Sequence, residues 1–569
     1  MSTTTPEPTI PNCGGCIGST IYLLKGATDF DYYDPQRVFT GEDFAFFGAT
    51  IMRSLVAYKY SSNAAEALTL VPDMATDTGT ANADATSWSF TLRDGLTWQD
   101  GSPVKCEDVK YGVSRTFATD VINGGPTHAI EYLDIPKAED GSSQYKGPYS
   151  STPEQQALFD AAVICDGNKI TFNLGEVVPD FNYATTIGFG AMPNPIDHPG
   201  VDTGELYVGD AVWSDGPYKI TTYNPTNGGS LVLGRNDEWS QASDDYRGAY
   251  PDKWEVDFGL DPQNIDDRII ESRGTDAFAL DYSNMAPESV STVFDDPHSP
   301  QTAFQGRAFA GFDRATSYYW INTKTVPKRD IRAAMAAALD RDAIRANEGG
   351  AYVGDFADGA VNPSIGRDYA PTGLWDTLLG QTIPPTGDPE YATTLIAQSG
   401  ETIPTVAWSY VSTPSGDAVA AIVQRSLEKA GFRVNLKPIS THGCAACNPD
   451  LGDFGAPSYP ISWTADWPNA STVIPPLFTA EAGYNPSSVD DTSGIPDWTA
   501  QVNDARTTLD RAAQALKWQE LNTEAAQQVW IIPTFFGLSQ NIAGTNVGGA
   551  YRWAPYASWP YAQLYVKVS

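Results

Sequence analysis

Several short stretches of the chain alternate apolar and polar residues, which is the pattern of β-strands that bury one face. In SWSFTLRDGLTWQDG, residues 87–101, the alternation continues on both sides of Asp94-Gly95 and predicts a β-hairpin that turns at this dipeptide. AAVICDGNKITFNL, residues 161–174, predicts a second hairpin with its own Asp-Gly turn. Two more strands around a glycine-rich loop are expected at YKITTY, 218–223, and SLVLGR, 230–235.

Apolar residues at helical spacing predict two clear helices. The first is expected in residues 106–117, where acidic residues occupy the first turn and interact favourably with the helix dipole. The second is expected over residues 330–350, with Asp330 as its N-cap and Gly349-Gly350 as its stop.

A strand–helix–strand pattern follows in the C-terminal half of the chain. TVAWSYV (405–411) alternates as a strand, AVAAIVQRSLEKAG (418–431) is an amphipathic helix, and FRVNLKPI (432–439) alternates again. At this spacing the three segments predict a βαβ unit with parallel strands. Residues 510–536 then predict a helix that continues into a strand. The architecture expected from the pattern is mixed α/β.

Length and composition narrow the class of protein. At 569 residues the chain exceeds the size of one hydrophobic core and suits two or three domains. Its hydrophobic content of 41%, with 15 Trp, 28 Tyr and 23 Phe, is that of a packed globular protein. The 35 basic and 70 acidic residues give a formal charge of −35, which repels nucleic acid and anionic membrane surfaces.

Six cysteines indicate an oxidising compartment, because their number is even and the composition suits an exported protein. We expect local disulfides within the two C-x-x-C pairs and a bridge between the remaining two cysteines. These pairs are Cys13–Cys16, Cys444–Cys447 and Cys106–Cys165. A four-thiolate zinc site built from both C-x-x-C pairs is the weaker alternative, since the pairs lie far apart in the sequence.

Motifs for catalysis and cofactor binding are absent from the sequence. It contains no nucleotide-binding glycine loop, no zinc-peptidase motif and no α/β-hydrolase nucleophile elbow. The four histidines are scattered, and none pairs with another at metal-ligand spacing. We therefore expect no metal and no cofactor. A secreted hydrolase stays open as an alternative, because the members of a catalytic triad can lie anywhere in a sequence.

Five segments together resemble the signature segments of the family 5 extracytoplasmic solute-binding proteins of ABC importers, in the family's order. The five segments are WSFTLRDGLTWQDGSPVKCEDVKYGVSR (88–115), SDGPYKI (214–220), GRNDEW (234–239), YYWINTKTVPKRDIRAAMAAALDRDAI (318–344) and WTADWPN (463–469). One such segment is a weak signal, whereas five in order are specific. The chain is therefore similar to the peptide-, nickel- and oligosaccharide-binding lipoproteins of this family.

The resemblance implies an α/β, periplasmic-binding-protein-like clamshell (class II-like) of three domains, with a discontinuous domain I. The ligand would bind between domains I and III, which close about a hinge. The expected boundaries are a flexible N-terminal tether at 1–18, domain I at 19–52, 205–311 and 535–569, an inserted and hairpin-rich domain II at 53–204, and domain III at 312–534.

The resemblance also implies one anchoring residue. In peptide-binding members the acid of the W-x-x-D segment holds the ligand's α-ammonium, and by position that acid is Asp466. The alternative is that Asp466 caps a turn before Pro468. The sequence departs from the family's pattern directly after this acid, at Pro468-Asn469-Ala470. Further residues that could line the ligand site are Trp463, Trp467, Trp408, Tyr410, Tyr319 and Asn322.

The resemblance implies oligopeptide capture for an ABC permease, without catalysis. An oligosaccharide ligand is the alternative within the same fold, because tryptophan also suits sugar stacking. We expect a monomer with the permease subunits as its membrane partners and no nucleic-acid partner. The expected location is extracellular, as a cell-membrane-anchored lipoprotein whose signal and lipid-bearing cysteine precede residue 1, with the polar segment STTTPEPT as a spacer.

Overall fold

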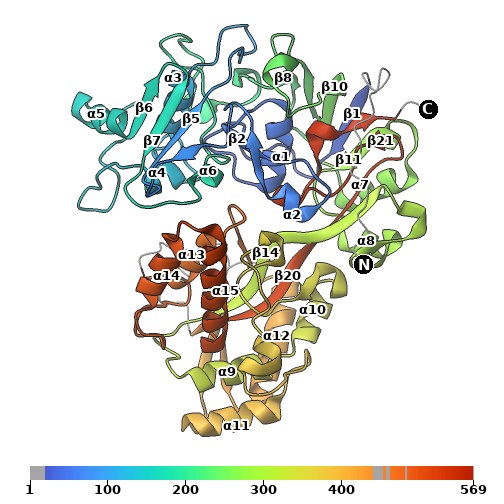
Figure 1. The fold of residues 1–569 in the computed structure, drawn as a ribbon. Helices are drawn as coiled ribbons and strands as arrows, with labels where there is room; N and C mark the ends of the chain where they lie inside the picture. Colours follow the sequence, from blue (N-terminus) through green and yellow to red (C-terminus); the bar gives the residue numbers. More distant parts are fainter. Residues whose placement is uncertain (1–18, 440–452, 456–461, 481–483, 568–569) are drawn as a thin grey trace. The chain divides into compact units, whose positions relative to one another are not determined.

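A computed structural model describes residues 19–439, 453–455, 462–480 and 484–567. The chain forms two compact units, the first from Met1–Gly311 and Gln540–Ser569 and the second from Phe312–Ser539. The long strands β14 (Ala308–Ile321) and β20 (Ile531–Ile542) carry the chain from the first unit into the second and back (Figure 1). The second unit therefore begins where domain III is expected to begin, and it ends inside β20.

The first unit is built on a five-stranded mixed sheet. Its order is β11-β1-β10-β9-β8, and β1 pairs in parallel with both β10 and β11. The strands are β1 (Thr20–Leu24), β8 (Tyr218–Tyr223), β9 (Ser230–Arg235), β10 (Lys253–Asp257) and β11 (Ala279–Asp281). Ile21, Leu23 and Trp254 point into the hydrophobic core of this unit. The two strands predicted at 218–223 and 230–235 are confirmed as β8 and β9, which pair antiparallel.

A separate four-stranded sheet lies in the same unit, in the order β4-β5-β7-β6. Its strands are β4 (Thr80–Ala81), β5 (Ser87–Thr91), β6 (Val163–Asp166) and β7 (Lys169–Asn173). The hairpin predicted in 161–174 is confirmed, since β6 and β7 pair antiparallel. The hairpin predicted around Asp94-Gly95 is wrong, because β5 pairs with β7 and β4 instead. The chain turns back at the next Asp-Gly, where Thr97 bridges Pro103.

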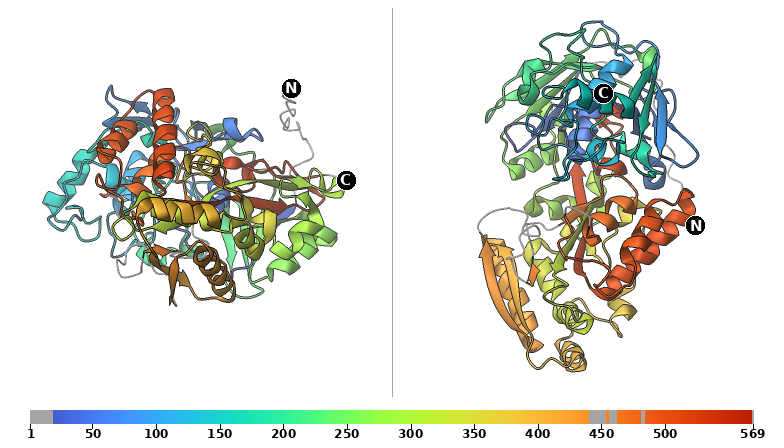
Figure 2. Two further views of the ribbon diagram at one scale, coloured as in Figure 1. Left: turned by 90° about the horizontal axis from the view of Figure 1, so that it is seen from below. Right: turned by 90° about the vertical axis from the view of Figure 1, so that its left-hand side faces the viewer.

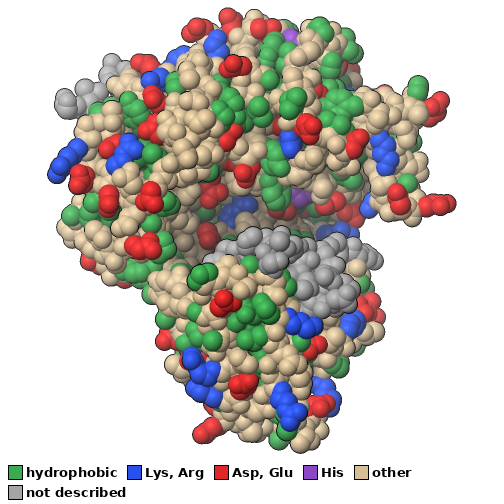
Figure 3. Space-filling model, turned by 180° about the vertical axis from the view of Figure 1, so that it is seen from behind, with side chains coloured by type: hydrophobic (Ala, Val, Ile, Leu, Met, Phe, Trp, Pro, Cys, Tyr) green, Lys and Arg blue, Asp and Glu red, His purple; other side chains and the backbone are tan. Residues whose placement is uncertain are grey.

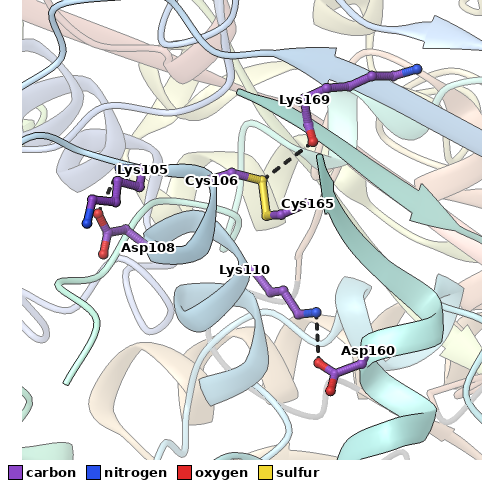
Figure 4. The surroundings of a disulfide bond; sticks show 7 residues. All are labelled: Lys105, Cys106, Asp108, Lys110, Asp160, Cys165 and Lys169. Carbon is purple, nitrogen blue, oxygen red and sulfur yellow. Dashed lines mark hydrogen bonds and ion pairs between the residues drawn. A yellow bond between two sulfur atoms is a disulfide. The ribbon is translucent and has the colours of Figure 1, made fainter. Parts of the chain in front are cut away.

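A disulfide joins this sheet to helix α3 (Cys106–Arg115), the helix predicted from residue 106. Cys106 and Cys165 are bonded across 59 residues of sequence, which ties the first turn of α3 to β6 (Figure 4). Nearby, Lys110 Nζ of α3 lies 2.7 Å from Asp160 Oδ1 of α5 (Pro153–Ala162). The other four cysteines, Cys13, Cys16, Cys444 and Cys447, lie outside the described residues.

The second unit is built on a seven-stranded sheet in the order β15-β20-β14-β18-β16-β17, with β19 also paired to β14. Its own strands are β15 (Gly354–Phe356), β16 (Thr405–Val411), β17 (Arg433–Ile439), β18 (Phe454–Gly455) and β19 (Ser462–Thr464). The predicted βαβ unit is confirmed: β16 and β17 are parallel, and α12 (Pro414–Lys429) connects them and packs on both. These three elements lie side by side in the right-hand view of Figure 2.

The single helix predicted over 330–350 is instead two helices, α9 (Arg329–Ala338) and α10 (Arg341–Glu348). Leu339 between them is extended, and the side chain of Asp340 accepts a hydrogen bond from the backbone N–H of Ala343. Asp340 therefore caps a new helix where apolar periodicity alone predicts continuation. Asp330, predicted as the N-cap, lies in the first turn of α9.

The remaining elements complete the two units. In the first unit they are α1 (Gly41–Thr50), β2 (Val56–Tyr58), α2 (Ala64–Ala67), β3 (Leu70–Pro72), α4 (His128–Tyr132), α6 (Phe181–Ala184), α7 (Pro262–Glu271), α8 (Pro287–Val293), β12 (Phe294–Asp296), β13 (Ser299–Pro300), β21 (Val547–Gly548) and β22 (Tyr565–Val566). In the second they are α11 (Pro389–Ser399), α13 (Ile474–Phe478), α14 (Trp498–Arg506) and α15 (Arg511–Gln528). Helix α15 followed by β20 confirms the predicted helix and strand at 510–536.

The surface carries the acidic charge of the composition. Acidic side chains are spread over the face shown in Figure 3, with basic side chains lying among them. Within the described ranges, no helix is both long and apolar enough to cross a membrane.

Candidate functional site

The segment predicted to hold the ligand lies in the second unit, directly after the short strand β19. This strand pairs antiparallel with β14, which places Trp463 opposite Thr316. The indole N–H of Trp463 donates to the carbonyl of Thr472 at 2.6 Å, and the ring lies 4.9 Å from that of Tyr484. Trp463 is half-buried. The long strand β14 and the indole hydrogen bond therefore fix the start of this segment.

Asp466 is a half-exposed carboxylate between two buried neighbours. Ala465 is 2% exposed and Trp467 is 1% exposed. The Arg314 guanidinium, on β14, donates from Nη2 to the carbonyl of Ala465 and, at 3.3 Å, to that of Asp466. The main chain on which the carboxylate sits is thus held by burial on both sides and by a guanidinium on its carbonyls.

The residues after Asp466, where the sequence departs from the family's pattern, hold the segment to the rest of the unit. The Asn469 side-chain amide donates to Gln514 Oε1 on α15 at 3.0 Å, and both groups are buried. Asn469 Oδ1 accepts from the Ser471 N–H and so caps the short 3₁₀ helix Ala470–Thr472. Asn469 is therefore the cap of the helical turn that follows Pro468.

An ion pair with a buried carboxylate supports the same turn. The backbone N–H of Ala470 donates to Asp368 Oδ2 at 2.8 Å, and Asp368 Oδ1 lies 2.6 Å from Arg511 Nη1. Arg511 also donates to the carbonyl of Pro468 at 3.3 Å. Ala470 and Asp368 are both fully buried. The departure at 468–470 is thus accounted for by packing.

Most aromatic candidates of the second unit lie in its hydrophobic core. Trp408 is 0% and Trp467 1% exposed, while Tyr319 and Tyr410 are 5% and 8% exposed. The rings of Tyr319 and Trp408 meet edge to face at 5.8 Å, and those of Trp408 and Tyr410 lie 5.4 Å apart. This burial favours packing as the role of these four rings. Their contact with a ligand stays a prediction.

Asn322 is half-buried and takes part in local main-chain contacts. Its Oδ1 accepts from the Lys324 N–H at 2.9 Å, and its own N–H donates to the Asp453 carbonyl at 2.9 Å. Among the predicted ligand residues, the structure leaves Asp466, Trp463 and Asn322 partly exposed.

The first unit contains a pocket that sequence reasoning missed. Aromatic side chains line this pocket, together with Gly48 of helix α1. The volume of the pocket is about 50 Å³. The Tyr60 ring stacks on that of Tyr246, with centroids 4.6 Å apart, and its centroid lies 4.5 Å from that of the tilted Trp553 ring. Phe44 and Tyr556 complete the aromatic lining, their rings 5.8 Å apart. We call this site the aromatic pocket. No local sequence signal could have found it, because its residues come from both chain segments that form this unit.

Two buried arginines, Arg53 and Arg247, also line the aromatic pocket, and each is paired with carboxylates. Arg53 Nε lies 2.9 Å from Asp73 Oδ1, and Arg247 Nη2 lies 2.7 Å from Asp73 Oδ2. Arg247 Nη1 also lies 3.0 Å from Asp244 Oδ2. Burial alone would raise the pKa of Asp73, but its pairs with Arg247 and Arg53 lower that pKa to about 2. The cluster therefore joins two arginines and two aspartates, whose charges balance.

Asp215, in the SDGPYKI segment, is a further buried acid in the field of this cluster. It is 5% exposed, and its Oδ2 has no hydrogen-bond partner among the described residues. Burial raises the pKa of Asp215 to about 7, although the positive charge of Arg53 opposes the shift. Of the residues that the structure describes, no three His, Cys, Asp or Glu side chains come together as a metal site.

Comparison with known proteins identifies the family. Residues 69–517 match the family model described as bacterial extracellular solute-binding proteins, family 5 middle. The chain belongs to this family. The predicted resemblance is thereby confirmed, and the chain is a member of a family of extracellular solute-binding proteins.

One curated relative is the oligopeptide-binding protein OppA of Bacillus subtilis (strain 168), 26% identical over 271 residues. That match spans 46% of this chain and 44% of the relative, so the chain is aligned over less than half of the relative's length.

Solved structures confirm the fold. The clavulanic acid biosynthesis oligopeptide binding protein 2 superposes with a TM-score of 0.81 at 22% identity, covering 97% of this chain and 96% of that one. The unliganded, open form of the periplasmic murein tripeptide binding protein MppA superposes with a TM-score of 0.69 at 16% identity, covering 97% and 98%. The predicted α/β periplasmic-binding-protein fold is therefore correct.

Proposed function

We propose that this family 5 solute-binding protein captures oligopeptides outside the cell membrane and delivers them to the permease of an ABC importer. The observation that carries the proposal is Asp466, a half-exposed carboxylate on a main chain held between buried Ala465 and Trp467. A peptide's α-ammonium is the ligand group that matches such a carboxylate. The names of the matched relatives, an oligopeptide-binding and a murein tripeptide-binding protein, support the same ligand class.

The energetics of the anchor follow from a charge-assisted hydrogen bond. Such a bond contributes roughly 1.5–3 kcal/mol net. Because Arg314 donates to the carbonyls of Ala465 and Asp466, the main chain needs no reorganisation when the ammonium arrives. The main chain that carries the carboxylate is thus preorganised.

An oligosaccharide ligand is less well supported by the second unit. Sugar rings stack on exposed aromatic faces, yet Trp408 and Trp467 are fully buried in the core. Trp463 alone among the predicted tryptophans is half-buried, and its indole N–H is already bonded to Thr472.

A secreted hydrolase is the alternative from a different class. Ser102 Oγ lies 3.5 Å from His198 Nε2, but the same hydroxyl donates its proton to Asp100 Oδ1. That proton is therefore not shared with the imidazole, as a nucleophile activated by a general base requires. Members of the matched family bind solutes, and we propose binding without turnover.

The location and assembly of the protein are further parts of the proposal. We propose a monomer on the outer face of the cell membrane, anchored by a lipid, with the polar residues 1–18 as its tether. The position of the ligand between domains I and III, and the division of the first unit into domains I and II, stay predictions.

Calorimetric titration of the purified protein with tri- to pentapeptides and with maltooligosaccharides tests the function. We expect tight binding of peptides, and a loss of roughly 10- to 100-fold in affinity for Asp466→Ala. Asp376→Ala, which removes an exposed acid from the same unit, is the matched control and should bind as the wild type. Tight sugar binding that survives Asp466→Ala, or hydrolysis of any titrated ligand, would contradict the proposal.

A further inference from the structure

Arg511 occupies the first position of helix α15 in the second unit, where the helix dipole disfavours a positive charge. The cap of this helix is the preceding residue Asp510, whose side chain accepts from the Ala513 N–H at 2.8 Å. The Arg511 guanidinium contacts Pro468 and Asp368, which lie outside the helix. The stability of α15 therefore does not account for an arginine at this position, whereas these two contacts do.

Both contacts of Arg511 lead to the turn that follows Asp466. Arg511 Nη2 donates to the carbonyl of Pro468 at 3.3 Å. Its Nη1 lies 2.6 Å from Asp368 Oδ1, and Asp368 Oδ2 accepts from the Ala470 N–H at 2.8 Å. The Asp368 side chain is 0% exposed. One ion pair thus holds both a carbonyl and an N–H group of this turn.

A second guanidinium holds the main chain on the other side of the same carboxylate. Arg314, on β14, donates to the carbonyls of Ala465 and Asp466. Main-chain carbonyls at Asp466 itself, directly before it and two residues after it therefore accept from guanidinium groups. Because a carboxylate follows its main chain, a displaced turn would move the Asp466 side chain away from the position that a ligand requires.

We propose that Arg511, with its charge balanced by Asp368, is a positioning residue for the α-ammonium anchor Asp466. This inference rests on the proposed peptide-binding function and deepens it. Arg511 acts through the turn at Pro468 and needs no contact with the peptide. Because the strength of a charge-assisted hydrogen bond depends on its alignment, the preference for a peptide with a free N-terminus should depend on Arg511.

The test compares a free tripeptide with its N-acetylated form by calorimetric titration. The readout is the ratio of the two affinities, because it reports on the anchor and not on binding in general. Arg511→Gln should lower the wild-type ratio by roughly tenfold. Arg511→Lys keeps a cation beside Asp368 and should lower the ratio by roughly threefold, the effect of one lost hydrogen bond to Pro468.

Arg329→Gln is the matched control in the same unit. Arg329 is also the first residue of a helix, α9, and its side chain is 30% exposed, against 32% for Arg511. It also donates to main-chain carbonyls, those of Gln527 at 2.9 Å and Leu378 at 2.7 Å. Gln527 lies roughly 24 Å along α15 from Arg511. Arg329→Gln should therefore keep the wild-type ratio.

Asp368→Asn breaks the same ion pair from its other end and should also lower the ratio by roughly tenfold. This variant carries the test if thermal unfolding shows that Arg511→Gln does not fold. The inference is wrong if the folded variants of Arg511 and Asp368 keep the wild-type ratio, or if Arg329→Gln loses it as strongly. Equal weakening of both peptides, with the ratio unchanged, would show a merely structural role and also contradict it.

In each of these cases the wild type still prefers the free peptide, so the proposed function stands. A wild-type protein that binds neither form, or binds both equally, would instead contradict the proposed anchor, and the positioning role of Arg511 would fail with it.

Discussion

The two units contain aromatic clusters of similar composition and opposite character. In the second unit, Trp408 and Trp467 are at most 1% exposed and pack inside the core. In the first unit, Tyr60 and Tyr246 are half-exposed and stack around a pocket. Aromatic residues in a sequence therefore do not mark a ligand site by themselves. What differs is whether the rings line a pocket or fill the core.

The position of β16 explains why its aromatic residues are buried. It lies inside the seven-stranded sheet between β17 and β18, and α12 packs against it. Residues 408–411 are consequently buried on both faces of the strand. A strand covered on both faces does not separate core from ligand side by alternation. The alternation in the sequence therefore could not tell whether Trp408 and Tyr410 face a ligand or the core.

The largest effect is expected from the buried tryptophan beside Asp466. Trp467→Ala removes an indole that is 1% exposed and should lower the free energy of unfolding by about 3–5 kcal/mol. Trp463→Ala, within β19 where that strand pairs with β14, removes a half-buried indole and should lower the free energy of unfolding by clearly less. Urea denaturation measures both variants. Equal losses of unfolding free energy would show that Trp463 is as much a core residue as Trp467, which would contradict this difference.

The first unit has a covalent support for which the described part of the second offers no counterpart. Replacing Cys106 and Cys165 together by alanine releases a loop closed over 59 residues and should lower the free energy of unfolding by about 4 kcal/mol. Hydrogen exchange should rise in β6 and β7 and stay unchanged in β16 and β17. Exchange that rises equally in both units would contradict this local role.

The charge cluster near the aromatic pocket predicts a pH dependence. Burial raises the pKa of Asp215 to about 7, so the folded protein keeps this proton while the unfolded chain loses it near pH ~4. Stability from this group is therefore complete below pH ~4 and is lost as the pH rises towards 7, by up to about 4 kcal/mol.

The variant Asp215→Asn isolates that contribution, because it keeps a neutral side chain at every pH. We expect it to match the wild type at pH 4 and to be the more stable protein at pH 8. Thermal or urea unfolding across this range gives the difference. A variant that is less stable than the wild type at pH 8 would show that Asp215 is ionised and stabilised in the folded state.

A smaller effect is expected for the ring stack of the pocket. Tyr60→Leu removes two ring contacts, with Tyr246 and Trp553, each contributing about 0.5–1.5 kcal/mol beyond burial. The free energy of unfolding should fall by about 1–3 kcal/mol, less than for Trp467→Ala. Urea denaturation provides the comparison, and a loss as large as that of Trp467→Ala would place Tyr60 in the core rather than at a pocket.

Sequence reasoning was accurate where pairing is local. The strands β8 and β9, and the βαβ unit from 405 to 439, lie where their patterns predict them. The hairpin at 87–101 was wrong because β5 pairs with β7, placing Ser87 opposite Asn173, and such distant pairing leaves no local pattern. The helix at 330–350 was divided by Asp340, whose side-chain hydrogen bond overrides apolar periodicity.

In the candidate sites, too, the sequence indicates some residues and not others. Asp466 could be proposed from the sequence because the acid, its tryptophans and the preceding segments occur in order along the chain, and its role in ligand binding stays a prediction. The aromatic pocket could not be found, since Gly48, Tyr246 and Trp553 come together only through the fold. Whether a given aromatic residue is core or rim also depends on the strands and helices that cover it.

The most direct test of the central claim is the effect of N-terminal acetylation on peptide affinity, measured for the wild type and Asp466→Ala. If Asp466 binds the α-ammonium, acetylation should weaken binding to the wild type by roughly 10- to 100-fold. The variant should then bind the free and acetylated peptides equally and weakly. A wild-type protein that binds both peptides with the same affinity would contradict the account.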